Sequence, residues 1–266
     1  MVRPVTTFTS AFLAAATLTG CTSAPAQPPP GSAPEERLRT EVVEVLAHDP
    51  AAFTQGLELV DGVLYEGTGL VGSSSIRSGP PGLPPTTRVP LDAGLFGEGI
   101  TVAGPTLWQL TWTDGFAIRR DAATLAERER VPFDGEGWGL CHQDGRDRLV
   151  MSDGSGTLTF RDPRTFAPTG TLEVRSAAGP VDELNELECV GEEVYANVWQ
   201  TDTVLRIDSA TGAVTARIDA SGLLSEAEQA QADVLNGIAA VAGTDQFLLT
   251  GKLWPKMFRT RLVPSG

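Results

Sequence analysis

The sequence has little positive charge. Its 20 Lys and Arg are outnumbered by 34 Asp and Glu, which gives a formal net charge of −14. A phosphate backbone is bound through clustered basic side chains, so this balance argues against a nucleic-acid partner. Histidine is also scarce: His48 and His142 are the only two, and no His, Cys and Asp cluster has the spacing of a zinc site. We therefore expect no metal and no cofactor.

Long apolar runs are absent as well. After Met1-Val2-Arg3, residues 8–18 form a weakly apolar stretch of the length found in secretory signals, too short for the roughly 20 residues that span a bilayer. Leu18-Thr19-Gly20-Cys21 then resembles a bacterial lipobox, in which Cys21 is lipidated. The alternative is an ordinary signal peptide with an incidental cysteine. The expected location is extracytoplasmic, with a lipid anchor to the cell membrane.

We divide the chain into three parts. Residues 1–21 are interpreted as the signal peptide with its lipobox, and residues 22–38, which include three consecutive prolines, as an extended tether. Residues 39–266 remain as the folded domain. Its many glycines and prolines, which are spread along the chain, favour turns over long helices.

A short phrase recurs in this domain. It begins with a polar residue, which in most copies is followed by a glycine, and an apolar strand comes next. Neighbouring copies are 38 to 51 residues apart, which is the repeat length of propeller blades. The five copies are Gln55-Gly56-Leu57, Glu98-Gly99-Ile100, Glu136-Gly137-Trp138, Asn185-Glu186-Leu187 and Asn236-Gly237-Ile238.

Each repeat continues as a series of half-buried strands, because polar and apolar residues alternate in it. The third and fourth repeats supply four strands each, as a propeller blade requires. The fifth offers only three, and residues 41–46 form a strand with no repeat of their own. We predict an all-β, five-bladed propeller of four-stranded antiparallel blades, in which residues 41–46 complete the last blade and close the ring. A capping box at Ser225 predicts one helix, which continues toward Leu235.

In each blade the start of the first strand lies beside the end of the second, at one face of the disc. The repeat phrase marks the first position, and the second strands are predicted to end near Glu66, Trp112, Asp153, Trp199 and Lys252. Indoles, carboxylates, amides and one ammonium would then meet around the channel mouth, a favourable setting for a small ligand. The alternative is structural: the polar groups would satisfy backbone atoms, and the tryptophans would pack the blades.

Every repeat also carries a longer motif. In chain order the motifs are Phe53-Thr54-Gln55-Gly56-Leu57, Leu64-Tyr65-Glu66, Ser74-Ser75-Ile76-Arg77, Phe96-Gly97-Glu98-Gly99-Ile100-Thr101, Leu110-Thr111-Trp112, Gly135-Glu136-Gly137-Trp138-Gly139-Leu140, Leu184-Asn185-Glu186-Leu187-Glu188, Ala196-Asn197-Val198-Trp199, Leu235-Asn236-Gly237-Ile238-Ala239 and Thr250-Gly251-Lys252-Leu253-Trp254-Pro255. Together, across residues 53–255, they resemble the plant and bacterial type of glutaminyl-peptide cyclotransferase.

This resemblance implies a metal-independent enzyme that acts on peptides or proteins with an N-terminal glutamine, converts that residue to pyroglutamate and releases ammonia. It also implies a set of residues that line the pocket: Phe53, Gln55, Glu98, Trp112, Trp138, Asn185, Trp199 and Lys252. We expect Glu98 to carry the proton and Gln55, Asn185 or Lys252 to contact the developing oxyanion. We expect a monomer. A non-catalytic propeller that binds ligands at the mouth and a scaffold that uses the rim are the alternatives.

Two cysteines remain in the domain. Cys141 and Cys189 occupy nearly equivalent places in the first strands of the third and fourth repeats. An exported protein can oxidise such a pair, provided that the Cα atoms lie within about 7 Å. Two buried free thiols are the alternative.

Overall fold

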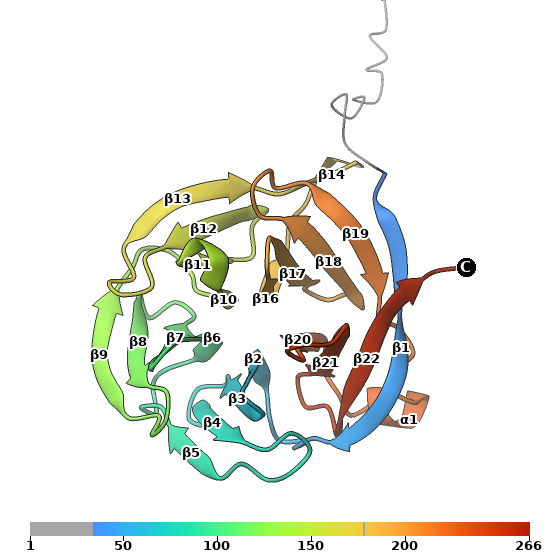
Figure 1. Cartoon of the computed structure of the whole chain (residues 1–266). Helices are drawn as coiled ribbons and strands as arrows, with labels where there is room; N and C mark the ends of the chain where they lie inside the picture. Colours follow the sequence, from blue (N-terminus) through green and yellow to red (C-terminus); the bar gives the residue numbers. More distant parts are fainter. Residues whose placement is uncertain (1–33, 178) are drawn as a thin grey trace, which may run out of the picture.

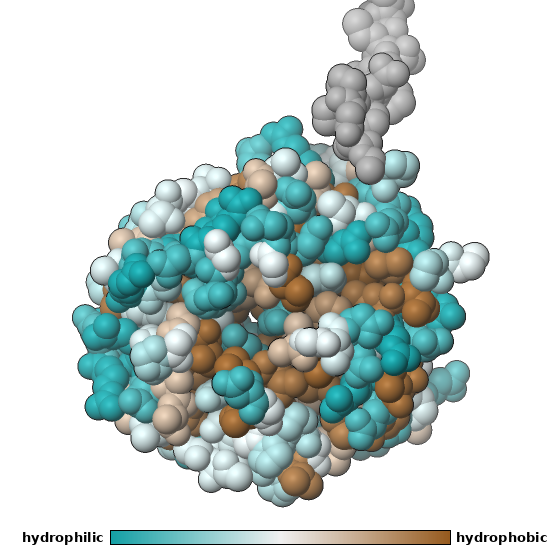
Figure 2. Space-filling model, viewed as in Figure 1, coloured by the Kyte–Doolittle hydropathy of each residue, from teal (hydrophilic) through white to brown (hydrophobic). Residues whose placement is uncertain are grey.

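The computed structural model describes residues 34–177 and 179–266, and in them the chain is almost entirely β-structure. Antiparallel sheets stand around a common axis like the blades of a propeller (Figure 1). The predicted all-β class and four-stranded antiparallel sheets are confirmed. Figure 2 shows the molecule hollowed at this axis, with apolar residues gathered beside the opening.

Three sheets have four strands each, in chain order. They consist of β2 (Thr54–Val60), β3 (Val63–Thr68), β4 (Ser75–Gly79) and β5 (Thr87–Pro90); β6 (Gly97–Ala103), β7 (Thr106–Thr111), β8 (Phe116–Asp121) and β9 (Glu127–Pro132); and β10 (Leu140–Gln143), β11 (Arg148–Met151), β12 (Thr157–Arg161) and β13 (Pro168–Glu173). The innermost strand of each is its first (Figure 1).

The fourth sheet has eight strands and joins both ends of the domain. Its order is β16 (Leu184–Val190), β17 (Glu193–Val198), β18 (Thr203–Asp208), β19 (Val214–Asp219), β1 (Glu36–Ala47), β22 (Lys256–Pro264), β21 (Gln246–Gly251) and β20 (Leu235–Ala240). A short hairpin, β14 (Arg175–Ser176) with β15 (Gly179–Pro180), stands apart from these sheets.

Strand β1 pairs antiparallel with β22 and, through Glu36–Arg39, parallel with β19. The predicted pairing of residues 41–46 with the last repeat is therefore confirmed. The strand begins earlier than predicted, however: residues 36–38, which we assigned to the tether, already pair with β19. Cys21 and the predicted signal peptide lie outside the described residues.

The apolar core lies between neighbouring sheets. Trp108 and Leu110 of β7, for example, pack with Leu140 and Leu149 of the third sheet, and all four are almost completely buried. Between the inner strands the contact is closer still. A Cβ atom on Gly99 would lie 2.5 Å from the carbonyl oxygen of Trp138, so only glycine fits at this position of the second repeat.

The fourth repeat has Glu186 where the others have glycine, and the Glu186 side chain is accommodated by hydrogen bonds to two other repeats. Its carboxylate accepts hydrogen bonds from the backbone N–H groups of Leu57 in β2 (3.1 Å) and Ile238 in β20 (2.8 Å). Glu186 thus connects the inner strands of three repeats.

The predicted helix is shorter than expected. Helix α1 spans Glu226–Gln229 and has the predicted capping box at Ser225, but it does not continue to Leu235. The next residues are drawn into extended pairing instead, because Asp233 N–H donates to Lys252 O and Lys252 N–H donates to Val234 O, each at 2.9 Å. Within the described ranges, no helix is long and apolar enough to cross a membrane.

Cys141 and Cys189 form a disulfide, with their Cα atoms 5.5 Å apart. They lie on β10 and β16, the innermost strands of neighbouring sheets. The question that the sequence left open is settled by this short distance, and the bond links the third sheet to the eight-stranded one.

Candidate active site

Four of the five predicted mouth residues occupy the same position in their strands. Gln55, Glu98, Asn185 and Asn236 are each the second residue of an inner strand, whereas Glu136 precedes β10. The four strand residues are buried. We use the word mouth for the ring that these five residues form together with the side chains in contact with them.

The hydrogen bonds at the ends of the second strands fix which residues are equivalent. Trp112, Trp199 and Lys252 each donate the backbone N–H to the carbonyl oxygen two residues before a repeat residue. In the first repeat, the residue that makes this bond is Gly69, to Phe53 O (2.8 Å). The prediction that Glu66 holds this place was wrong by three residues, because counting along the sequence did not reveal the register of the strands.

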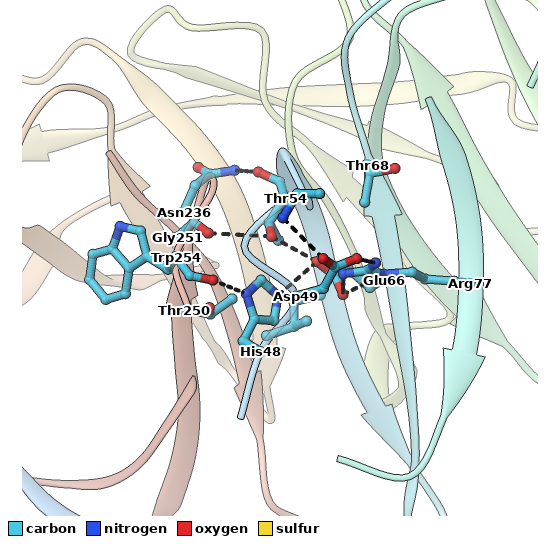
Figure 3. Close-up of polar contacts among 12 residues, drawn as sticks. His48, Asp49, Thr54, Glu66, Thr68, Arg77, Asn236, Thr250, Gly251 and Trp254 are labelled. Atoms are coloured by element: carbon cyan, nitrogen blue, oxygen red, sulfur yellow. Dashed lines mark hydrogen bonds and ion pairs between the residues drawn. The ribbon is translucent and has the colours of Figure 1, made fainter. Parts of the chain in front are cut away.

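A chain of side-chain amides leads to Glu98. Gln55 Nε2 donates to Glu98 Oε1 at 2.8 Å, and Asn236 Nδ2 donates to Gln55 Oε1 at 3.3 Å and to Thr54 O at 3.0 Å (Figure 3 shows the bond to Thr54). Asn236 thereby fixes the orientation of the Gln55 amide, and Gln55 fixes Glu98.

Glu98 and Lys252 are both about 95% buried. Burial raises the pKa of the Glu98 carboxyl well above its ordinary value, and the nearby Lys252 ammonium opposes this rise without cancelling it. Burial also lowers the pKa of Lys252, against the attraction of Glu98. The Lys252 Nζ lies 5.0 Å from the centre of the Phe53 ring, within cation–π range. Both groups are thus brought closer to neutrality, the condition in which a proton is easily exchanged.

Aromatic rings line the mouth from the first repeat to the fourth. Phe96 packs against Phe53 (6.2 Å between ring centres) and Trp112 (5.6 Å), and Trp138 packs edge-on against Trp199 (5.6 Å). Such edge and tilted contacts are the geometries that aromatic pairs favour.

Glu136 connects the two halves of this wall. Its Oε2 accepts hydrogen bonds from the indole N–H groups of Trp112 (2.7 Å) and Trp138 (2.9 Å). A single carboxylate oxygen therefore orients two indoles from neighbouring repeats. Sequence analysis placed Glu136 in the ring but gave it no role.

Asn185 belongs to the fourth repeat, whereas Gln55 belongs to the first. Its backbone carbonyl accepts from Ser152 Oγ (2.6 Å), which holds the start of β16 in place. Its buried side-chain oxygen has no hydrogen-bond partner among the described residues. A buried polar atom without a protein partner is costly unless a bound molecule satisfies it, so Asn185 is available to a ligand.

The eight residues assigned to the pocket thus lie around one opening, on inner strands or directly beside them. Two further residues belong with them, Phe96 and Asn236. Phe96 directly precedes the Gly97-Glu98-Gly99 phrase, so its place before the repeat residue was the available signal. Asp153, also predicted at the mouth, instead stabilises its own turn by accepting from Ser155 N–H (3.0 Å) and Oγ (2.6 Å).

Glu66 belongs to a different group, which we call the junction cluster: His48, Asp49, Glu66 and Arg77, between the first sheet and the end of β1 (Figure 3). A cavity of about 300 Å³ lies beside it, lined in part by the Gly- and Pro-rich segment 79–85. The charged groups of the cluster are hydrogen-bonded to one another, which distinguishes this cavity from the mouth. Among the residues that the structure describes, no group of three or more His, Cys, Asp or Glu could hold a metal ion.

Comparison with known proteins shows the family of the chain. Residues 12–262 match the family model described as glutamine cyclotransferase. A glutaminyl-peptide cyclotransferase from Arabidopsis thaliana is 39% identical over 245 residues, which cover 85% of this chain and 72% of the plant protein. The crystal structure of Myxococcus xanthus glutaminyl cyclase is 36% identical, with a TM-score of 0.78, over 87% of this chain and all of that one. The chain belongs to the glutamine cyclotransferase family.

Proposed function

We propose that this chain cyclises the N-terminal glutamine of peptides or proteins to pyroglutamate, with release of ammonia. The observation that carries the proposal is Glu98: a buried carboxyl, held by the Gln55 amide, near an ammonium and inside an aromatic wall. Membership of the glutamine cyclotransferase family supports the same reaction.

The substrate supplies both reacting groups. Its neutral α-amine attacks its own γ-carboxamide carbon, a C–N bond forms, and the carbonyl electrons move to oxygen. Glu98 accepts a proton from the attacking nitrogen and donates it to the amide nitrogen, after which the old C–N bond breaks and ammonia leaves. The amine has an ordinary pKa of about 7.7–8.0, so a carboxyl whose pKa is raised toward that range transfers a proton efficiently in both directions.

The remaining residues position the substrate. The aromatic wall excludes water and holds the glutamine side chain bent toward its amine, and such alignment of an intramolecular reaction contributes up to about 7–11 kcal/mol. Lys252 and the amide of Gln55 or Asn185 are the donors for the developing oxyanion. The unpartnered Asn185 Oδ1 is an acceptor, so its partner in the complex would be an N–H group of the substrate.

We also propose that the sheets form a five-bladed propeller with β20, β21, β22 and β1 as the fifth blade. The pairing of β1 with both β22 and β19 supports this assignment, since it joins the first strand of the domain to the last repeat and to its neighbour. We expect the propeller to act as a monomer.

For the segment before the propeller, we propose export and lipidation at Cys21, on the lipobox-like Leu18-Thr19-Gly20-Cys21. Cys21→Ala should abolish labelling by a lipid precursor and release the protein from the membrane fraction. Unchanged membrane retention would mean that another element anchors the protein.

The test of function is ammonia release from dipeptides that begin with glutamine, followed in a coupled assay. We expect turnover that survives extended treatment with strong chelators. Binding of the same peptides without ammonia release would indicate a non-catalytic binding propeller. Absence of both would indicate a scaffold, and loss of activity on chelation with recovery on zinc addition would contradict the metal-free mechanism.

A further inference from the structure

The wall around the mouth is incomplete at the first repeat. At the equivalent hydrogen-bonded position, the second, fourth and fifth repeats place Trp112, Trp199 and Lys252, but the first has Gly69. A Cβ atom on Gly69 would lie 2.5 Å from the Phe96 ring and 3.1 Å from Gln55 Cγ, so no side chain fits there. The first repeat thus contributes no side chain of its own at this position, and the ring of Phe96 lies against Gly69 instead.

The residues that follow Gly69 are apolar and exposed. The fractional exposure of Leu70 is 38% and that of Val71 is 63%, and Trp112, at 40%, stands next to Phe96 in the neighbouring repeat. Exposed apolar side chains that adjoin a binding site are more informative than scattered ones, because they extend its surface.

Leu70 also holds a strained backbone conformation. Its φ angle is +80°, in the left-handed region that bulky side chains rarely adopt. The residues that follow Trp199 and Lys252 at the equivalent position, Gln200 (+61°) and Leu253 (+60°), also have positive φ angles. The left-handed conformation therefore belongs to this turn of the repeat, and in the first repeat it presents Leu70 beside the mouth.

The turn is nevertheless well ordered by hydrogen bonds. Leu70 O accepts from the N–H groups of Ser73 and Ser74 and from Ser74 Oγ, and Ser74 Oγ in turn accepts from Gly97 N–H at 3.0 Å. Gly97 directly precedes Glu98. The turn is thus tied to the strand that carries the proton-transferring residue, which preserves its position relative to the mouth.

Charge differs around the ring. Residues 69–75 contain no charged side chain, and the Asp114 carboxylate accepts from Phe96 N–H at 3.4 Å. The third and fourth repeats instead expose Glu136 and Glu183 near the mouth. The part of the mouth that the first repeat forms is therefore its apolar side.

We propose that the turn at residues 69–73 binds the side chain of the substrate residue that follows the N-terminal glutamine, and that it selects an apolar side chain there. The inference rests on the proposed function. With glutamine enclosed at Glu98, the second residue of the peptide lies at the edge of the mouth, where Leu70, Val71 and Trp112 are the exposed apolar side chains.

The first test compares kcat/KM for ammonia release from amidated dipeptides: Gln-Leu, Gln-Phe, Gln-Gly, Gln-Glu and Gln-Lys. Wild-type protein should prefer Gln-Leu and Gln-Phe to Gln-Glu by about tenfold, the size of effect expected for one apolar subsite. Equal values for all five would overturn the subsite and leave the proposed function intact. No release from any of them would overturn the proposed function, and the subsite with it.

Two variants locate the preference. Val71→Glu should lower kcat/KM for Gln-Leu about fivefold or more and favour Gln-Lys. Val63→Glu is the control, because Val63 is also an exposed valine (37%) but begins β3, the strand that precedes the turn, at the end away from residues 69–73. Identical profiles for the two variants would contradict the proposal.

Leu70→Gly distinguishes an effect on the binding of the second substrate residue from an effect on folding. Glycine relieves the left-handed strain, so the melting temperature should not fall, while the preference for Gln-Leu over Gln-Gly should shrink. An undiminished preference would show that Leu70 does not contact the second residue.

Discussion

Glu98 at the mouth and Glu66 in the junction cluster are both buried carboxylates near a cation, and they differ in how completely they are paired. Glu66 Oε2 lies 2.6 Å from Arg77 Nη2, and its Oε1 lies 3.1 Å from His48 Nε2 and 2.7 Å from the Thr54 hydroxyl. Glu98 accepts a hydrogen bond from the Gln55 amide, at 2.8 Å.

The pKa values follow this difference. For Glu66, burial disfavours the charged form, but His48, Arg77 and the Thr54 hydroxyl outweigh it and lower the pKa to about 2. For Glu98, burial prevails and raises the pKa. A buried carboxylate that is fully paired holds a structure together, and one that is left with an amide and a nearby ammonium keeps its proton available for chemistry.

The largest expected effect is at the mouth. Glu98→Gln preserves the size of the side chain but removes proton transfer, so kcat should fall by about 10²–10⁴-fold with the fold unchanged. Steady-state kinetics and a melting curve measure the two quantities together. Turnover near that of the wild type would remove Glu98 from the mechanism.

At the junction the expected effect is on stability. Arg77→Met leaves Glu66 without one of its two cationic partners, and breaking a buried pair in this way costs about 3–5 kcal/mol of unfolding free energy. Urea denaturation measures this cost. Arg164→Met is a suitable control, because Arg164 pairs with Asp147 on the surface, where ion pairs contribute about 0–1 kcal/mol. Equal effects in the two variants would contradict the structural role of the cluster.

A third group of carboxylates extends the comparison to pH. Glu58, near Glu186 and Glu188, accepts from Val102 N–H at 2.6 Å, and burial raises its pKa from 4.5 to about 7. Its contribution to stability is therefore complete below pH 4.5 and is lost as the pH rises through 7. Glu66 behaves oppositely: its contribution is present above pH 4.5 and is lost as the pH falls toward 2.

Glu58→Gln should thus remove part of the loss of stability between pH 5 and 8, by about 1–3 kcal/mol. Urea midpoints at several pH values, for the variant and the wild type, measure the difference. An unchanged slope on the alkaline side would show that Glu58 does not titrate in the folded protein over this range.

The smallest expected effect concerns Asn236, which acts through Gln55. Asn236→Ala frees the Gln55 amide, weakens its bond to Glu98 and so disfavours the carboxylate form. We expect kcat to fall about tenfold, with the acid limb of the pH–rate profile shifted to higher pH. Since Asn236 acts through Gln55, Asn236→Ala should add little to Gln55→Ala, and full additivity would contradict the proposed chain.

Much of the fold was predictable because period-two alternation marks half-buried strands and a repeat phrase marks each inner strand. The pairing of residues 41–46 with the last repeat was predictable because that repeat has only three strands of its own and residues 41–46 form a strand without a repeat. The register inside a repeat was not predictable in the same way. Glu66 was assigned to the mouth in place of Gly69, because a difference of three residues in where the second strand ends hardly changes the spacing between repeats.

Interactions between distant residues also left no pattern to find. Glu66 and Arg77 face each other across β3 and β4, but His48 comes from the end of β1, and only the packing of that segment against the first sheet brings it into the cluster. The helix at Ser225 was correctly placed at its start, which a capping box determines locally. Its end was wrong, because the backbone of Lys252 competes for residues 233–234.

The pairing of β1 with β22 also has a consequence for how the chain folds. Its partners lie more than 200 residues apart in sequence. During synthesis β1 is made first, and Val42 and Val45 have no strand partner until β22 has been made. Contacts of such long range slow folding, and a waiting apolar strand invites pairing with another chain. The step that completes the eight-stranded sheet is thus the stage at which aggregation competes most strongly with folding.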